Sequence, residues 1–130
     1  MLPRRIATLA LVSDVIAVIV FAAIGRMSHG RPDDLLGLLG TAAPFVVGVV
    51  ASWVLPLVRA HPAGLRAGLA VWLGTAVLGL LVRAGFTGEL PMSFAVITLV
   101  ALGVLLLGWR ALSAAVSHRV RLRAAVIPPD

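Results

Sequence analysis

Four long apolar stretches account for most of this 130-residue chain, and they constrain its fold more than any other feature. Hydrophobic residues make up 61% of the chain and charged residues only 12%, whereas soluble domains carry roughly 25% charged residues. A membrane-spanning helix needs about 20 predominantly apolar residues, so four spans with short connections use nearly the whole length. The sequence therefore predicts an all-α integral membrane protein, a four-helix transmembrane bundle without a soluble domain.

The expected organisation is one domain over residues 1–116, followed by a basic cytoplasmic tail over residues 117–130. Connections rich in Arg, Asp, Gly and Pro separate the apolar stretches, as is typical of solvated loops. The first stretch could also be a signal peptide. It is longer than a usual signal-peptide core and contains Asp14, so a spanning helix is favoured. The expected helices are 6–25, 35–58, 65–82 and 92–116.

Arginines are distributed unevenly between the two sides of this predicted bundle. Basic residues in short loops are retained on the cytoplasmic side, and eight arginines fall on the side of the two termini against three on the other. This predicts a multi-pass cell-membrane protein with both termini in the cytoplasm, and it opposes insertion in both orientations. The eight are Arg4, Arg5, Arg59, Arg66, Arg110, Arg119, Arg121 and Arg123, and the three are Arg26, Arg31 and Arg83.

The net charge of +6 comes from these same arginines at the helix ends and in the tail. Arginines gathered at helix ends set topology and attract anionic lipid headgroups on the cytoplasmic side. We therefore expect the lipid bilayer as the partner, with a second copy or another membrane protein as a further partner, and no nucleic acid.

Small residues at helical spacing predict where the helices pack, because membrane helices associate through close contact of small side chains. Two such stripes are interpreted as packing seams, within a compact bundle or at a dimer interface, with a ligand-lining face as the alternative. They comprise Gly40, Pro44, Gly48 and Ser52 in the second helix, and Gly64, Gly68, Thr75 and Gly79, with Trp72, in the third.

Proline and tryptophan positions add three expectations. Pro44 removes one backbone donor inside a helix, which predicts a kink, and a bend is favoured over a binding site there. Trp53 and Trp109 lie near the cytoplasmic ends of their helices, where an indole suits the headgroup boundary. Trp72 is deeper and is expected in the core.

The sequence holds no recognisable catalytic or metal-binding pattern. It has no cysteine, and its three histidines, His29, His61 and His118, fall at helix ends on both sides. It has no phosphate-binding loop, nucleophile elbow or zinc-protease motif. We therefore expect a protein that is not an enzyme and that uses no metal and no cofactor.

Asp14 is the outstanding polar residue, because a carboxylate within a membrane span is costly and by default indicates a functional site or a buried pair. Its helical face carries Ala7, Ala10 and Ala17, with Phe21 a turn further, so Asp14 should face the bundle. Two interpretations remain open, with the first favoured: a structural carboxylate held by hydrogen bonds or an arginine, or a carboxylate that binds protons or cations during transport. The intramembrane polar candidates are Asp14, Arg110, Arg83 and Thr75.

Depth and direction select Arg110 over Arg83 and Arg26 as a partner for Asp14. Arg83 and Arg26 lie at the far end of the first span. Side chains lean toward the N-terminus of their helix, so Asp14 leans inward and Arg110 leans toward the bilayer centre. If the first and fourth spans are neighbours, the two groups approach each other. The competing interpretation, slightly favoured, is that Arg110 extends to lipid headgroups beside Trp109.

The sequence resembles a family of small prokaryotic four-helix membrane proteins classified as a domain of unknown function, over about Ala7 to Leu112. This likeness implies the four-helix topology and no activity. A looser likeness to small multidrug transporters rests on an acidic residue in the first helix. The family likeness is carried by Asp14, Ile24-Gly25-Arg26, Ser28-His29, Pro44-Phe45, Trp72, Thr75, Gly79, Arg83, Ser93-Phe94 and Gly108-Trp109-Arg110.

Two hypotheses about function follow from these features. The first is a non-enzymatic structural or interaction component of the membrane, based on the small-residue seams. The alternative is a small proton- or cation-coupled transporter that uses Asp14 beside the Pro44 bend.

Overall fold

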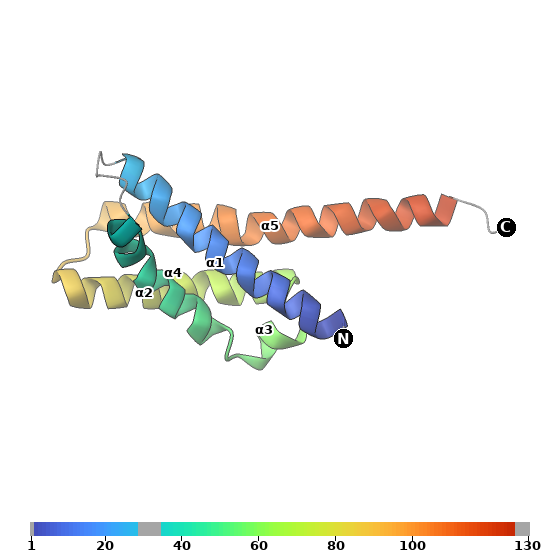
Figure 1. Cartoon of the computed structure of the whole chain (residues 1–130), viewed down its shortest axis with the longest axis horizontal. Helices are drawn as coiled ribbons and strands as arrows, with labels where there is room; N and C mark the ends of the chain where they lie inside the picture. The colour runs from blue at the N-terminus through green and yellow to red at the C-terminus, as the bar shows by residue number, and fades with distance from the viewer. Residues whose placement is uncertain (1, 29–34, 127–130) are drawn as a thin grey trace.

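The computed structural model describes residues 2–28 and 35–126, and within them it contains five helices and no strand (Figure 1). Four of the helices are long and apolar enough to cross a membrane: α1 (Leu2–Ser28), α2 (Leu35–Ser52), α4 (Leu65–Thr87) and α5 (Met92–Val126). The fifth, α3 (Pro56–Ala60), is a single short turn of helix between α2 and α4. The predicted all-α membrane fold with four spans is thereby confirmed.

The four long helices form a closed ring of neighbours. α1 contacts α2 and α5, and α4 contacts the same two helices, with the most extensive contact between α2 and α4. The core between them is built from fully buried side chains such as Val18, Val49, Val71 and Leu102. An edge-to-face pair of aromatic rings, Phe21 and Phe45, joins α1 to α2 with ring centroids 5.1 Å apart.

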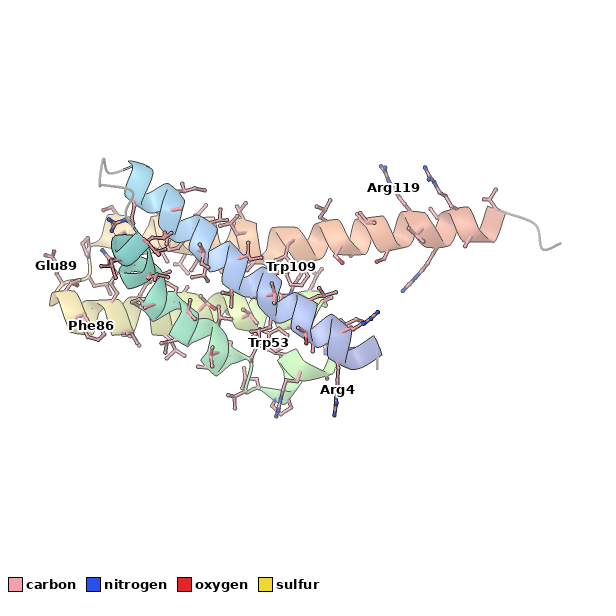
Figure 2. All side chains as sticks on the ribbon, viewed as in Figure 1. Arg4, Trp53, Phe86, Glu89, Trp109 and Arg119 are labelled. Carbon is pink, nitrogen blue, oxygen red and sulfur yellow. The ribbon has the colours of Figure 1, made fainter. Side chains whose placement is uncertain are left out.

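The two ends of this bundle differ in charge. α1 begins and α5 ends toward the same end of the molecule (Figure 1). We call this the arginine-rich end, because Arg4 and Arg119 lie there (Figure 2). We call the opposite end the Glu89 end, after Glu89 in the connection between α4 and α5 (Figure 2). The first and fourth spans are thus neighbours that run in opposite directions, which is the arrangement that the argument for an Asp14 and Arg110 pair required.

The second helix is shorter than the predicted 35–58. α2 ends at Ser52, a turn follows, and α3 starts at Pro56. The residue before a proline is pushed away from helical geometry, and Leu55 accordingly has extended backbone angles of φ −67° and ψ 131°. The expectation was wrong because hydrophobicity continues across Pro56 while the helix does not.

The other three helices are longer than predicted. α1 covers Leu2–Ser28 instead of 6–25. α4 continues past residue 82 to Thr87, where Gly88 ends it with a left-handed φ of 78° and an N–H donated to the Ala84 carbonyl. α5 continues through most of the predicted tail to Val126, since neither Gly nor Pro interrupts residues 117–126. The tail is therefore largely helix.

The inward and lipid-facing sides of α1 are those that the sequence predicted. Ala10, Asp14 and Ala17 are buried, whereas Leu9 and Ile16 are 66% and 53% exposed. Large exposed apolar side chains are expected on a membrane protein, because lipid tails solvate them as well as the core does.

Glycine positions show which predicted seams bring backbones together. A Cβ atom added at Gly48 would lie 2.8 Å from the Thr75 Cα and 2.9 Å from the Thr75 carbonyl oxygen, so α2 and α4 touch there through their backbones. Gly79 similarly leaves room for the ring of Phe45, and Gly74, opposite Ser52, leaves room for that side chain. Gly40 takes no part in a seam within the bundle, because it lies on an exposed face of α2 where an added Cβ would meet nothing within 4 Å.

Pro44 lies inside α2 and is buried. The helix is continuous from Leu35 to Ser52 around it, and the kink there stays a prediction.

Candidate functional site: a buried carboxylate with four donors

Asp14 and Arg110 form an ion pair in the interior of the helical ring. Both residues are 0% exposed. The Arg110 Nη1 lies 2.7 Å from the Asp14 Oδ1, and the Arg110 Nη2 lies 2.8 Å from the Asp14 Oδ2, so the guanidinium grips both carboxylate oxygens. This bidentate geometry gives the strongest hydrogen bonds that an arginine makes to a carboxylate. Arg110 therefore does not extend to lipid headgroups, and the slightly favoured interpretation was wrong.

Two tryptophans complete the shell of the carboxylate. The Trp109 Nε1–H donates to the Asp14 Oδ1 and the Trp53 Nε1–H donates to the Asp14 Oδ2, each at 2.9 Å. Trp53 directly follows the end of α2 and Trp109 lies on α5 (Figure 2). The expectation that both indoles serve the headgroup boundary missed this role, because their N–H groups point into the bundle.

The Arg110 guanidinium is also tied to the protein around it. Its Nε donates to the Pro62 carbonyl at 3.0 Å, and its Nη1 donates a second bond to the Leu106 carbonyl at 3.1 Å. Its central carbon lies 4.4 Å from the ring centroid of Trp109, within cation–π range. Four hydrogen bonds and an aromatic face thus hold this guanidinium.

Gly68 on α4 makes space for the arginine. A Cβ atom at this position would lie 2.8 Å from the Arg110 Cδ and 2.8 Å from the Leu107 Cδ2. The sequence predicted Gly68 as a packing residue. Gly68 packs against the aliphatic stem of the buried Arg110 side chain, so this seam is part of the site.

The partners of the pair come from different parts of the chain. Asp14 lies midway along α1, but Trp53 directly follows the end of α2, and Pro62 lies in the connection between α3 and α4. The segment from residue 53 to residue 64 therefore closes the arginine-rich end beneath the pair. Two of the partners of the pair, Trp53 and Pro62, thus come from this segment.

The chemistry of the cluster is that of an ionised acid with every acceptor position used. A carboxylate offers about four lone-pair positions on its two oxygens, and here two N–H donors reach each oxygen. Burying an isolated charge is costly, but a bidentate pair with further hydrogen bonds offsets much of that cost. The geometry favours a fixed, charged carboxylate.

The other candidates from the sequence lie elsewhere. Arg83 is at the Glu89 end, where its guanidinium carbon lies 4.4 Å from the ring centroid of Phe94. Thr75 is fully buried at the contact with Gly48, and its hydroxyl has no hydrogen-bond partner among the described residues. Trp72 donates its indole N–H to the Leu99 carbonyl at 2.8 Å and so joins α4 to α5, as a core residue should.

Metal ligands are not gathered anywhere in the described part of the chain. No group of three His, Asp or Glu side chains within residues 2–28 and 35–126 is placed to hold a metal ion. His29 lies outside these residues.

Replacing Trp53 or Trp109, which donate to the charged Asp14 carboxylate, should destabilise the protein more than replacing Trp72, which donates to a neutral carbonyl. We expect Trp53→Phe and Trp109→Phe each to lower the free energy of unfolding by about 1.5 kcal/mol, because each removes a hydrogen bond to a charged group. Trp72→Phe removes a bond to a neutral carbonyl and should cost about 0.5–1 kcal/mol. Thermal unfolding in a mild detergent checks this order. Equal losses from all three substitutions would contradict it.

Four helices able to span a membrane, together with a charged pair sealed inside them, define this chain as an integral membrane protein of unknown activity. It belongs to the family described as protein of unknown function DUF3054, which matches residues 11–113. This confirms the resemblance found in the sequence, and the match includes both Asp14 and Arg110. Neither a curated protein nor a solved structure matches the chain.

Proposed function

We propose that this protein is a non-enzymatic structural or interaction component of the membrane, and that its Asp14 and Arg110 pair is a structural lock. One observation carries the proposal: the Asp14 carboxylate is 0% exposed and receives four N–H donors from three side chains. These donors come from α5 and from the residue that follows α2. A single carboxylate on α1 thus ties together three parts of the ring.

The same geometry weighs against the alternative, a transporter that uses Asp14. A transported proton or cation would need a free lone pair on the carboxylate, and each oxygen already accepts two bonds. Binding would therefore displace Arg110, which would leave its guanidinium as an unpaired charge in the interior at a cost of several kcal/mol, or a tryptophan, which would leave a buried indole N–H without its acceptor.

The interaction part of the proposal rests on the end of α5. At 1.5 Å per residue this 35-residue helix is about 52 Å long, well beyond the roughly 30 Å of hydrocarbon. Every residue from 111 to 126 is exposed, and Figure 2 shows Arg119 on this projecting segment. Its arginines would meet anionic headgroups or an acidic surface of another membrane protein or a second copy on the cytoplasmic side.

A flux measurement separates the lock from the transporter. Vesicles that contain the purified protein and enclose a pH-sensitive or a sodium-sensitive dye should lose an imposed proton or sodium gradient no faster than protein-free vesicles. Asp14→Asn should not change this rate, but it should reduce the amount of folded protein in the membrane because the pair is broken. Asp130→Asn, at an acid far from the pair in the sequence, is the matched control. Protein-dependent flux that Asp14→Asn abolishes would establish the transporter instead.

Topology is tested separately. We expect a reporter active only in the cytoplasm to work when fused after Asp130, and one active only outside to work when inserted in the connection 88–91. Both follow from the eight arginines on the side of the termini. External activity of the fusion after Asp130 would contradict the proposed orientation.

A further inference from the structure

A cavity of about 290 Å³ lies at the Glu89 end of the bundle, away from the buried pair. All four long helices contribute to its walls, together with the connection between α4 and α5. Neither Asp14 nor Arg110 lines it. It is therefore a second site, and the proposed structural lock does not account for it.

Two arginines on different helices face this cavity. Arg26 comes from α1 and Arg83 from α4, and Glu89 is the one acidic residue among the described lining side chains. The Arg26 Nη1 donates to the Thr41 Oγ1 at 3.3 Å, and the Arg83 guanidinium lies over the face of Phe94. Both cations are thus held in position by the protein, which reduces the cost of ordering them around a ligand.

Polar and apolar groups both line the cavity. The hydroxyls of Thr41 and Ser93 accompany the arginines, while Phe21 and Ile97 supply apolar surface. Ile97 is 58% exposed and Leu90 is 48% exposed. In a membrane these two side chains would border lipid tails, so the cavity places two arginines and two hydroxyls next to an apolar surface that faces lipid.

We propose that this cavity binds the phosphate group of an amphiphilic phosphate ester, with its glycerol inside and its acyl chains outside. Two guanidiniums and neighbouring hydroxyls suit a group that presents three or more acceptor oxygens, whereas a carboxylate is satisfied by a single arginine. The volume is at the lower limit of ligand pockets, roughly 300 Å³, which suits a headgroup rather than a whole lipid. The site adds a ligand to a protein otherwise proposed as structural.

The wild-type protein in a neutral detergent provides the first test. Short-chain phosphatidic acid should raise its unfolding temperature, whereas diacylglycerol with the same chains and no phosphate should not. Glycerol 3-phosphate and inorganic phosphate test whether the bound phosphate group comes from a lipid or from a soluble molecule. If either one stabilises the protein at a concentration similar to that of phosphatidic acid, the ligand is a soluble phosphate. Equal effects of phosphatidic acid, diacylglycerol and a fatty acid would overturn the proposal.

Variants then locate the site. Arg83→Gln should weaken binding of phosphatidic acid about tenfold, since it removes a charge-assisted contact. Arg66→Gln, at an exposed arginine of the opposite end, is the matched control and should leave binding unchanged. Thr41→Val keeps the shape of the side chain and removes its hydroxyl, so it tests the site even if Arg83→Gln fails to fold. Equal weakening by Arg66→Gln, or unchanged binding in both Arg83→Gln and Thr41→Val, would refute the cavity as the site.

Salt separates this site from the exposed arginines on α5. In roughly 0.5 M salt the Debye length falls to a few Å, so binding to exposed arginines should be lost. Binding in the half-buried cavity should persist, and the triple variant Arg119→Gln, Arg121→Gln and Arg123→Gln should retain it. Loss of all phosphatidic acid binding in high salt or in this triple variant would show that the exposed arginines are the binding site.

Discussion

Arg110→Met should lower the free energy of unfolding by about 3–5 kcal/mol, because it leaves the Asp14 carboxylate as an uncompensated buried charge. Methionine fills much of the space of the arginine stem, so the loss is electrostatic rather than a cavity effect. The substitution also strands the Pro62 carbonyl, which accepts from the Arg110 Nε in the native protein.

Chemical or thermal unfolding in detergent, followed by tryptophan fluorescence, measures this loss. Trp53 and Trp109 both contact Asp14, so their emission reports directly on the cluster. Arg66→Met removes an exposed arginine near the same end of the bundle and should change stability by less than about 0.5 kcal/mol. A loss no larger for Arg110→Met than for Arg66→Met would contradict the assignment of Arg110 to a buried pair.

Gly48→Leu should destabilise the protein by about 3 kcal/mol through overpacking between α2 and α4. Even the first side-chain carbon would lie 2.8 Å from the Thr75 Cα, and a backbone atom cannot rotate away as the end of a side chain can. The two helices would have to separate, and the buried Thr75 and Val49 would lose their packing.

Gly40→Leu is the matched control for that experiment. Gly40 lies two turns earlier on the same helix, and an added Cβ there meets nothing within 4 Å. Leucine also has a higher helix propensity than glycine, so Gly40→Leu should be neutral or slightly stabilising. If both substitutions destabilise alike, the contact between α2 and α4 at Gly48 is not the seam described above.

The lengths of the four apolar stretches were enough to predict the four spans. Backbone groups in lipid have no water to bond to, so a long apolar stretch that crosses the membrane has few alternatives to a helix. Boundaries were less predictable. The apolar run continues across Pro56, so hydropathy does not show that α2 ends at Ser52. The basic residues 117–126 were assigned to a tail for their charge, although nothing in them stops a helix from continuing.

The site was predictable in part for a similar reason. The face of Asp14 and the direction in which Arg110 leans follow from helix geometry along each chain segment. The roles of Trp53 and the Pro62 carbonyl depend on how the segment after α2 folds back beneath the bundle, and no local pattern encodes this. The sequence places Trp53 and Trp109 near the cytoplasmic ends of their helices, the side toward which Asp14 leans, and this was the signal available for the indole donors.

A double-mutant cycle on Asp14→Asn and Arg110→Met tests most directly whether these residues act as one structural unit. Each single variant leaves one member of the pair without its partner, whereas the double variant removes both charges. We predict that the double variant is more stable than the sum of the two losses implies, with a coupling energy of about 2–3 kcal/mol from unfolding in detergent. Losses that add to within about 0.5 kcal/mol would contradict the structural lock.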